Sequence, residues 1–308
     1  MRKLKLQKTD TYGIEIEFVS HHKTQLEKGL SQLKSDNKLN PAWLIKREKT
    51  CDVTNDSKIG LEVNSPIMDD RTEWLRELQI VLEVLQKQTE INDQCAIHFH
   101  IGKQIFEDNV TYLQNLILLW CHYEDILFRY ATGEYRMFRK SIVDYAKPLN
   151  QSLTYRQVMS LHKSQILPVF LTQMIGSVSK RNAISLLPYY QSIIYQNELD
   201  DTYKKKTIEF RIFATTYQYS LIYSYLECLL QMIDYAKHMS KEMRDYYFES
   251  LMNDKDILEK SQYDVPIEQY LKLHQEKAKA FCDSIFTEEE SKKQFMKIYT
   301  CKNKSYGE

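Results

Sequence analysis

Three short segments of the chain alternate ionisable and apolar side chains with the two-residue period of a β-strand. They are GIEIEF with Glu15 and Glu17, AIHFHIG with His98 and His100, and TIEFRIF with Glu209 and Arg211; GLEVNSP, with Glu62 and Asn64, is a fourth. Residues i and i+2 of a strand point to the same face, so each pair shares one face and the intervening isoleucines and phenylalanines take the other. This pattern constrains the chain to a sheet with one apolar face and one highly charged face.

The remaining patterns place helices between and after these strands. Strands are expected at 4–20, within 41–66 as two short strands around a polar turn at 54–57, at 94–102 and at 206–214, with a further candidate at 182–187. Helices are expected at 22–36, 71–90, 104–146, 154–175, 217–250 and 266–298. This mixture indicates an α+β fold, in which helices cover one face of a mostly antiparallel sheet.

We expect one domain over residues 1–308. Its core motifs span 12–216, with a helical insert at about 104–175 and a C-terminal helical tail at about 217–308.

Composition excludes several classes of protein. Lys and Arg together number 42, as do Asp and Glu, so no net charge attracts nucleic acid or an anionic membrane surface. The six cysteines lack CxxC spacing, and no apolar run is long enough to cross a bilayer. We therefore expect a cytoplasmic protein with reduced thiols, which binds neither nucleic acid nor membranes.

The charged face of the expected sheet requires compensation. Two carboxylates about 5 Å apart repel each other by roughly 3 kcal/mol at an effective dielectric constant near 20. Divalent cations relieve such repulsion, and an oxygen-rich ligand set favours Mg²⁺ or Mn²⁺. Imidazoles can bind the same cations or donate to phosphate, and the guanidinium of Arg211 matches phosphate oxygens. The chain has neither GxxxxGK[ST] nor GxGxxG, so a nucleotide would be held by cations and basic side chains.

Other candidates have ordinary alternatives. Asp52 or Asp56 could complete the carboxylate set, although both are also typical turn residues. Lys180 and Arg181 could reach phosphate or lie in a solvated loop. Lys204 to Lys206 are more typical of a solvated turn than of a substrate-binding cluster. The aromatic residues between 112 and 145 are more typical of helix packing than of a ring-stacking site.

Taken in chain order, these segments resemble the motifs of the amidoligase family. The sequence contains GIEIEF, an Asp-x-Thr segment leading to G-x-E-x-x-S-P, then H-x-H-x-G and T-x-E-F-R, over about residues 12–235. The family is related to glutamine synthetases and glutamate–cysteine ligases. The resemblance implies a glutamine synthetase-like curved, mostly antiparallel sheet whose polar face holds two or three Mg²⁺ around the phosphates of ATP.

The resemblance also implies a role for each matching residue. Glu15, His98 and Glu209 would bind one cation, and Glu17, Glu62 and Asp52 a second. His100 would contact ATP phosphate, Arg211 the transferred phosphoryl group, and Arg181, with Lys180 beside it, phosphate or substrate. The sequence departs from the family pattern at Ala96, Val53-Thr54 and Ala214, and the second departure leaves Asp56 as a competitor of Asp52.

The activity implied is an ATP-dependent carboxylate–amine ligase that forms an amide or peptide bond through an acyl phosphate. Its partners would be a small-molecule or peptide substrate with a carboxylate, and an amine acceptor. Two other functions use similar residues: a metal-dependent hydrolase of a phosphoester or amide, and a non-catalytic nucleotide- or metal-binding module. Phosphate release from ATP that requires both a carboxylate and an amine would separate them.

Overall fold

The computed structural model describes residues 9–52, 58–132, 145–178, 180–195, 206–257 and 267–301, together with Leu4, Leu6 and Gln7. The strands are β1 (Tyr12–Ser20), β2 (Leu44–Arg47), β3 (Ile59–Asn64), β4 (Ala96–Gly102), β5 (Ile184–Ser185) and β6 (Thr207–Ala214). The α-helices are α1 (Lys23–Ser35), α2 (Thr72–Gln88), α3 (Val110–Thr132), α5 (Leu149–Ser152), α6 (Tyr155–Lys163), α7 (Leu167–Met174), α8 (Leu187–Ile194), α9 (Tyr219–His238), α10 (Lys241–Ile257), α11 (Ile267–Ile285) and α12 (Glu289–Cys301). Two short 3₁₀ helices are η1 (Lys49–Cys51) and η2 (Lys103–Phe106).

The six described strands form one sheet in the order β2-β3-β1-β4-β6-β5, and every neighbouring pair is antiparallel. This confirms the expected antiparallel sheet with helices. The first strand starts at Tyr12, later than the expected 4–20, and the expected polar turn at 54–57 lies outside the described residues.

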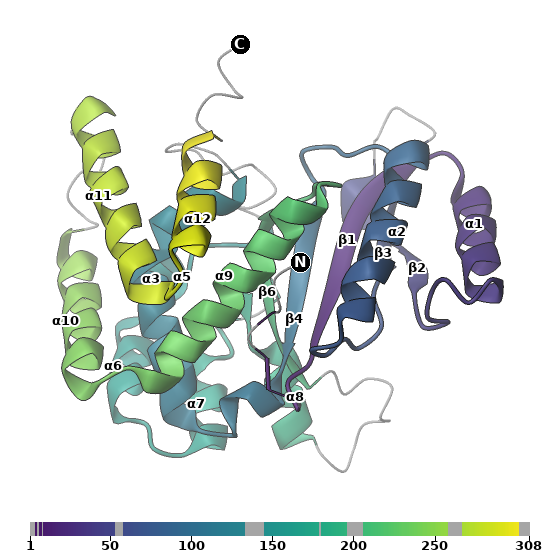
Figure 1. Cartoon of the computed structure of the whole chain (residues 1–308). Helices are drawn as coiled ribbons and strands as arrows, with labels where there is room; N and C mark the ends of the chain where they lie inside the picture. Colours follow the sequence, from purple (N-terminus) through teal and green to yellow (C-terminus); the bar gives the residue numbers. More distant parts are fainter. Residues whose placement is uncertain are drawn as a thin grey trace.

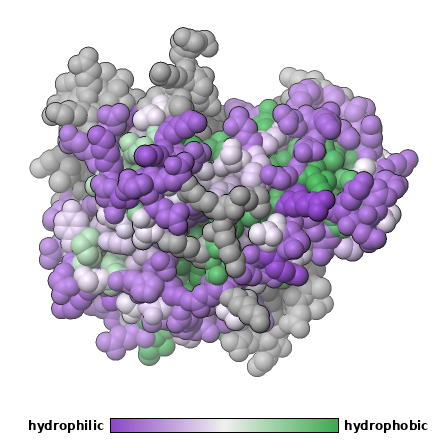
Figure 2. Space-filling model, viewed as in Figure 1, coloured by the Kyte–Doolittle hydropathy of each residue, from purple (hydrophilic) through white to green (hydrophobic). Residues whose placement is uncertain are grey.

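Helices cover one face of this sheet, and α2 and α9 lie across it in Figure 1. The apolar set of β1 (Ile14, Ile16 and Phe18) is at most 1% exposed and belongs to one large core cluster. α2 contributes six buried residues at helical spacing: Trp74, Leu75, Leu78, Val81, Leu82 and Leu85. The outer surface of this helical layer is mainly hydrophilic (Figure 2). The ionisable residues are thereby directed to the opposite face of the sheet.

The aromatic helix α3 belongs to the core. The ring of Trp120 lies 5.6 Å from that of Phe210 on β6, and Trp120 donates a hydrogen bond to the buried Glu124. α9, expected as part of a tail, packs against the same strand, where the rings of Tyr225 and Phe213 are 4.6 Å apart. No helix among the described residues is long and apolar enough to cross a membrane.

Three expected helices are each divided in the structure, and the expected 266–298 helix becomes α11 and α12. The expected 154–175 helix becomes α6 and α7, because Pro168 sits in the first turn of α7 and starts a new helix. The expected 217–250 helix becomes α9 and α10, which meet at the extended Met239.

Candidate functional site

Strand register brings the predicted residues of the polar face together. Across the sheet, Glu17 pairs with Glu62, Glu15 with both Asn64 and His98, and His100 with Glu209. Residues directly opposite each other in an antiparallel pair point to the same face. Four strands therefore supply adjacent carboxylates and imidazoles to a single surface.

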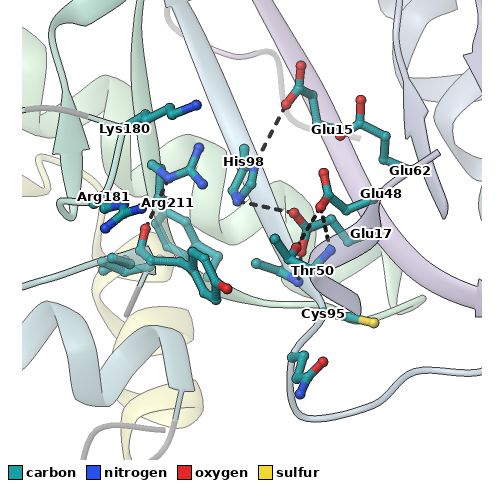
Figure 3. Close-up of a pocket in the computed structure, with 16 residues that line it drawn as sticks. Glu15, Glu17, Glu48, Thr50, Glu62, Cys95, His98, Lys180, Arg181 and Arg211 are labelled. Carbon is teal, nitrogen blue, oxygen red and sulfur yellow. Dashed lines mark hydrogen bonds and ion pairs between the residues drawn. The ribbon is translucent and has the colours of Figure 1, made fainter. Parts of the chain in front are cut away.

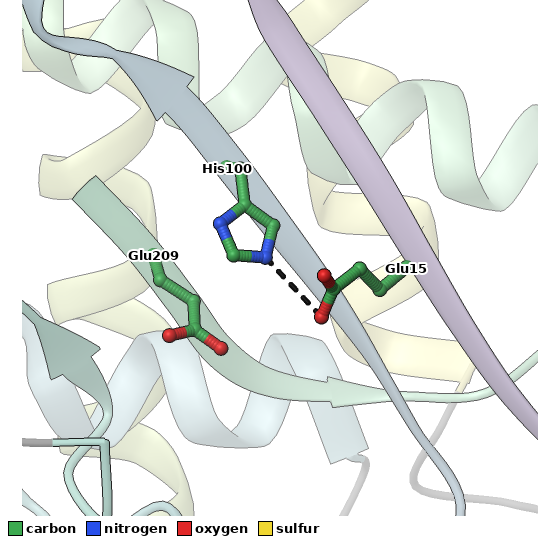
Figure 4. Close-up of side chains that lie close together, drawn as sticks. All are labelled: Glu15, His100 and Glu209. Carbon is green, nitrogen blue, oxygen red and sulfur yellow. Dashed lines mark ion pairs between the residues drawn. The ribbon is translucent and has the colours of Figure 1, made fainter. Parts of the chain in front are cut away.

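One set of ligand atoms is compact enough for a single cation. One ligand atom from each of Glu15, His100 and Glu209 lies within 4.8 Å of the others (Figure 4). His100 Nε2 is 3.3 Å from Glu15 Oε2 and forms no hydrogen bond, while Nδ1 lies 3.2 Å from the hydroxyl of Thr207, which orients the ring. A six-coordinate cation with ligands at about 2.1 Å holds neighbouring ligand atoms about 3 Å apart. The two carboxylates and the imidazole therefore fit Mg²⁺ or Mn²⁺ after a small closing movement.

His98 lies at the centre of the acidic face. Its Nδ1 is 3.5 Å from Glu15 and 3.7 Å from Glu209, and its Nε2 is 3.7 Å from Glu17. The predicted set of Glu15, His98 and Glu209 is thus also brought together. Either histidine is close enough to serve beside the two carboxylates.

Glu17 is the most deeply buried carboxyl group of this face. Burial raises its pKa to about 8, although His98 acts in the opposite direction. The backbone N–H of Ala96 donates to Oε2 at 2.8 Å, and the thiol of Cys51 lies 3.5 Å from the same oxygen. Burial, followed by the charge of Glu15, also raises the pKa of Glu62. A bound cation would favour the charged form of both carboxyl groups and so oppose the effect of burial.

Arg211 lies at an irregularity in the sheet. The register between β4 and β6 shifts between Ile97 and Phe99, a β-bulge that re-aims side chains on β6. The guanidinium donates from Nη1 to Glu209 Oε1 and from Nε to the carbonyl of Tyr145 at 3.2 Å. Burial is the largest single influence and opposes ionisation of Glu209, but Arg211, His100 and His98 together outweigh it, and the pKa of Glu209 lies below its ordinary value.

The structure does not bring Asp52 to this group. Its carboxylate pairs with the guanidinium of Arg47 and accepts from the backbone N–H of Gly60 at 2.9 Å. The hydrogen bonds from Arg47, followed by that from Gly60, lower its pKa. Its competitor Asp56 lies outside the described residues.

Glu48, which was not singled out from the sequence, faces the acidic group instead. Its Oε1 accepts hydrogen bonds from the backbone N–H and the hydroxyl of Thr50, at 2.8 and 2.6 Å. Glu48-Lys49-Thr50 has the same acid-x-Thr spacing as Asp52-Val53-Thr54, so the motif occurs twice within seven residues. Spacing alone could not choose between the two copies.

A cavity of about 370 Å³ opens beside Glu15, Glu17 and His98 (Figure 3). We call it cavity A. Its charged lining divides into carboxylates (Glu15, Glu17, Glu48 and Glu62) and basic side chains (Lys180, Arg181 and Arg211). Such a lining suits a small ligand that carries both signs of charge.

A second cavity, of about 580 Å³, lies on the other side of Glu15 and includes His100. We call it cavity B. Its walls include the apolar side chains of Leu44 and Ile67, which are 50% and 78% exposed, and its rim carries Lys46 and Lys206. The predicted phosphate contacts are therefore divided, with His100 in cavity B and the others in cavity A. Cavity B is lined in part by residues of three motifs (Glu15, Ser65-Pro66 and His100), but its apolar and lysine residues belong to no motif.

Fold and site together define a mixed α/β protein with a carboxylate- and histidine-rich site on an antiparallel sheet. The sequence model of a family described as "putative amidoligase enzyme" matches residues 34–233, more than half of the chain. The chain belongs to this family. The matched span contains Glu62, His98, His100, Glu209 and Arg211, whereas Glu15 and Glu17 precede it.

Comparison with solved structures gives distant likenesses, and one of them is to a ligase. The crystal structure of a bifunctional glutathione synthetase from Pasteurella multocida aligns with a TM-score of 0.39 and 14% sequence identity. The alignment covers 97% of this chain and 47% of that one, so the chain spans about half the length of that protein. No curated protein matches the chain.

Proposed function

We propose that the protein is an ATP-dependent carboxylate–amine ligase that forms an amide or peptide bond through an acyl phosphate, and that its sheet is the curved sheet of glutamine synthetase-like ligases. One observation carries the proposal: ligand atoms of Glu15, His100 and Glu209 converge within 4.8 Å, directly beside Arg211. Family membership supports an amide-forming activity. The same cluster would also serve the two rival functions, and family membership is the observation that favours the ligase.

Two clusters of carboxylate side chains would hold the divalent cations. Glu15 and Glu209, with His98 or His100, form the first group, and Glu17, Glu62 and Glu48 line the adjacent part of cavity A. Bound Mg²⁺ or Mn²⁺ would neutralise phosphate charge and polarise the transferred phosphoryl group. All of these ligands except Glu48, which precedes η1, lie on strands, so their positions require little reorganisation during turnover.

The reaction follows from the charges around the cations. A substrate carboxylate oxygen attacks the γ-phosphorus of ATP, an O–P bond forms, and the bond to ADP breaks. Arg211 donates hydrogen bonds to the phosphoryl oxygens as charge develops, and His100 does the same when His98 serves as the cation ligand. An amine then attacks the acyl carbon, the C–N bond forms, and the C–O bond to phosphate breaks, with loss of one proton from the amine.

The two cavities suit different reactants. Cavity B is larger, has apolar walls at Leu44 and Ile67, and has lysines at its rim, which fits a nucleoside with its phosphates directed toward His100. Cavity A has basic and acidic sides, which fits a carboxylate substrate and an amine acceptor. We assign ATP to cavity B and the two other substrates to cavity A, with the γ-phosphate between them at Glu15.

The test is phosphate release from ATP in the presence of Mg²⁺ and a mixed pool of amino acids and short peptides. We expect release that requires both a carboxylate and an amine, together with a condensed product by mass spectrometry. The matched control is Glu209→Gln, which keeps the side-chain size and should lose turnover at least a hundredfold. Phosphate release or amide cleavage that needs no amine would support the hydrolase instead, and Mg²⁺ and ATP binding without turnover would support the binding module.

A further inference from the structure

We propose that Arg211 is an internal counter-cation that the divalent cation displaces. In the metal-free protein the guanidinium neutralises Glu209; when a divalent cation takes this carboxylate, Arg211 is released toward the anionic ligand in cavity A. The proposal rests on the metal site of the proposed function. It adds an order of events: cation binding prepares the arginine that then binds phosphate or carboxylate.

The contacts of Glu209 identify the shared atom. Arg211 Nη1 donates to Glu209 Oε1, and the same oxygen lies 3.7 Å from His98 Nδ1. The oxygen that Arg211 engages is therefore directed toward the centre of the acidic face, rather than away from it. A cation between Glu15 and Glu209 would need an electron pair from this region of the carboxylate.

Because the site is buried, the guanidinium of Arg211 and a divalent cation would compete for the carboxylate of Glu209. The side chain of Glu209 is 8% exposed and that of Arg211 is 15% exposed, so water screens their interaction poorly. A divalent cation bound to Glu209 would place two further positive charges close to the guanidinium. The pair would then lose its attraction, and the guanidinium would gain from moving toward an anion.

Arg211 has both an anchor and a destination. Its Nε donates to the carbonyl of Tyr145 at 3.2 Å, which holds the planar guanidinium at the wall of cavity A, where small rotations about the aliphatic bonds of the side chain would move its terminal nitrogens away from Glu209. Arg211, Lys180 and Arg181 all line cavity A, so the released group would join a basic wall that already faces the substrate side. Lys46, by contrast, lies opposite Glu62 in the pairing of β2 with β3, on the far side of β1 from Glu209, so it does not replace Arg211 as the counter-ion of Glu209.

Thermodynamic linkage makes the idea measurable. If the cation frees Arg211 for an anion, the anion must raise the affinity for the cation by the same factor. Removal of the guanidinium should therefore have two opposite effects. The cation alone should bind more tightly, because it no longer displaces a counter-ion, and its coupling to an anion should weaken.

The first experiment is titration calorimetry of the full chain with Mn²⁺, without nucleotide, for wild type, Arg211→Gln, Arg211→Lys and Arg181→Gln. We expect Arg211→Gln to bind Mn²⁺ at least tenfold more tightly than wild type. Arg181→Gln removes the same charge from the same cavity and should stay within threefold of wild type. Arg211→Lys should be intermediate, since it keeps the charge but loses the planar fork.

Several results would overturn the proposal. Equal or weaker Mn²⁺ binding by Arg211→Gln would show that the arginine is not displaced, and an equal gain for both arginine variants would show only a general field effect. If wild type binds no Mn²⁺, the metal site and this proposal both fail, whereas binding that is insensitive to position 211 overturns this proposal alone. Thermal melting of each variant before titration establishes that the folded protein is compared.

The second experiment measures binding of inorganic phosphate with and without saturating Mn²⁺. We expect Mn²⁺ to raise the phosphate affinity of wild type and of Arg181→Gln by at least fivefold. For Arg211→Gln the enhancement should be at least threefold smaller than for wild type, leaving only the part that comes from direct phosphate–metal contact. An undiminished enhancement in Arg211→Gln would refute the coupling.

Discussion

Replacement of Glu17 by glutamine should make the metal-free protein more stable at neutral pH, although it removes a proposed metal ligand. The side chain of Glu17 is 6% exposed, and burial raises its pKa to about 8 from an ordinary value of 4.5. Between these two pH values the folded state holds a proton on Glu17 that the unfolded state has lost. The free energy of unfolding is therefore highest below about pH 4.5 and falls as the pH rises toward 8.

The size of this effect follows from the pKa difference. Each pH unit in this interval lowers the free energy of unfolding by about 1.4 kcal/mol, so the loss between pH 4.5 and pH 7 is about 3 kcal/mol. Glutamine does not titrate, and its amide oxygen can still accept the N–H of Ala96, which donates to the carboxyl at 2.8 Å. For a chain of 308 residues, 3 kcal/mol corresponds to roughly 5 °C in melting temperature.

The assay is thermal denaturation of wild type and Glu17→Gln in EDTA from pH 4.5 to 8.5. The two curves should coincide near pH 4.5 and separate as the pH rises, with the variant more stable. Glu83→Gln, on the exposed face of α2, is the matched control and should follow wild type. Added Mg²⁺ should stabilise wild type increasingly toward pH 8 and the variant little. Parallel pH profiles for wild type and Glu17→Gln would refute the reasoning.

Two further predictions concern the surrounding residues. Glu48→Gln should weaken Mn²⁺ binding and turnover at least tenfold. Asp52→Asn should lower the melting temperature, because it removes the ion pair with Arg47, but should leave turnover within threefold of wild type. Calorimetry and kinetics on both variants test this, and the reverse pattern would restore Asp52 as the metal ligand. Gly13→Val should raise the KM for ATP at least tenfold with less than a 2 °C change in melting temperature, because a Cβ there meets only Ser65 and His100, at 3.6 and 3.8 Å, and projects into cavity B. An unchanged KM would exclude nucleotide binding in that cavity.

The period-two pattern of the strands is sufficient to specify most of the acidic face. Alternation in GIEIEF, AIHFHIG and TIEFRIF fixes which side chains share a face, because the direction of successive side chains is a local property of a strand. The coarse fold and the family follow from the same segments and their order. The sequence pattern predicts helix boundaries less well, because breaks such as the one before α7 depend on single residues within an otherwise helical pattern.

The choice between two similar carboxylates, in contrast, depends on how the strands pair. Asp52 and Glu48 stand in equivalent acid-x-Thr motifs, but Asp52 is bound by Arg47 on β2 and by Gly60 on β3, two residues that the pairing of these strands brings together. The division of the basic and apolar lining between two cavities likewise arises from register and packing. Local sequence sets the direction of a side chain within its strand, but its neighbours across the sheet are set by long-range pairing, which no single segment encodes.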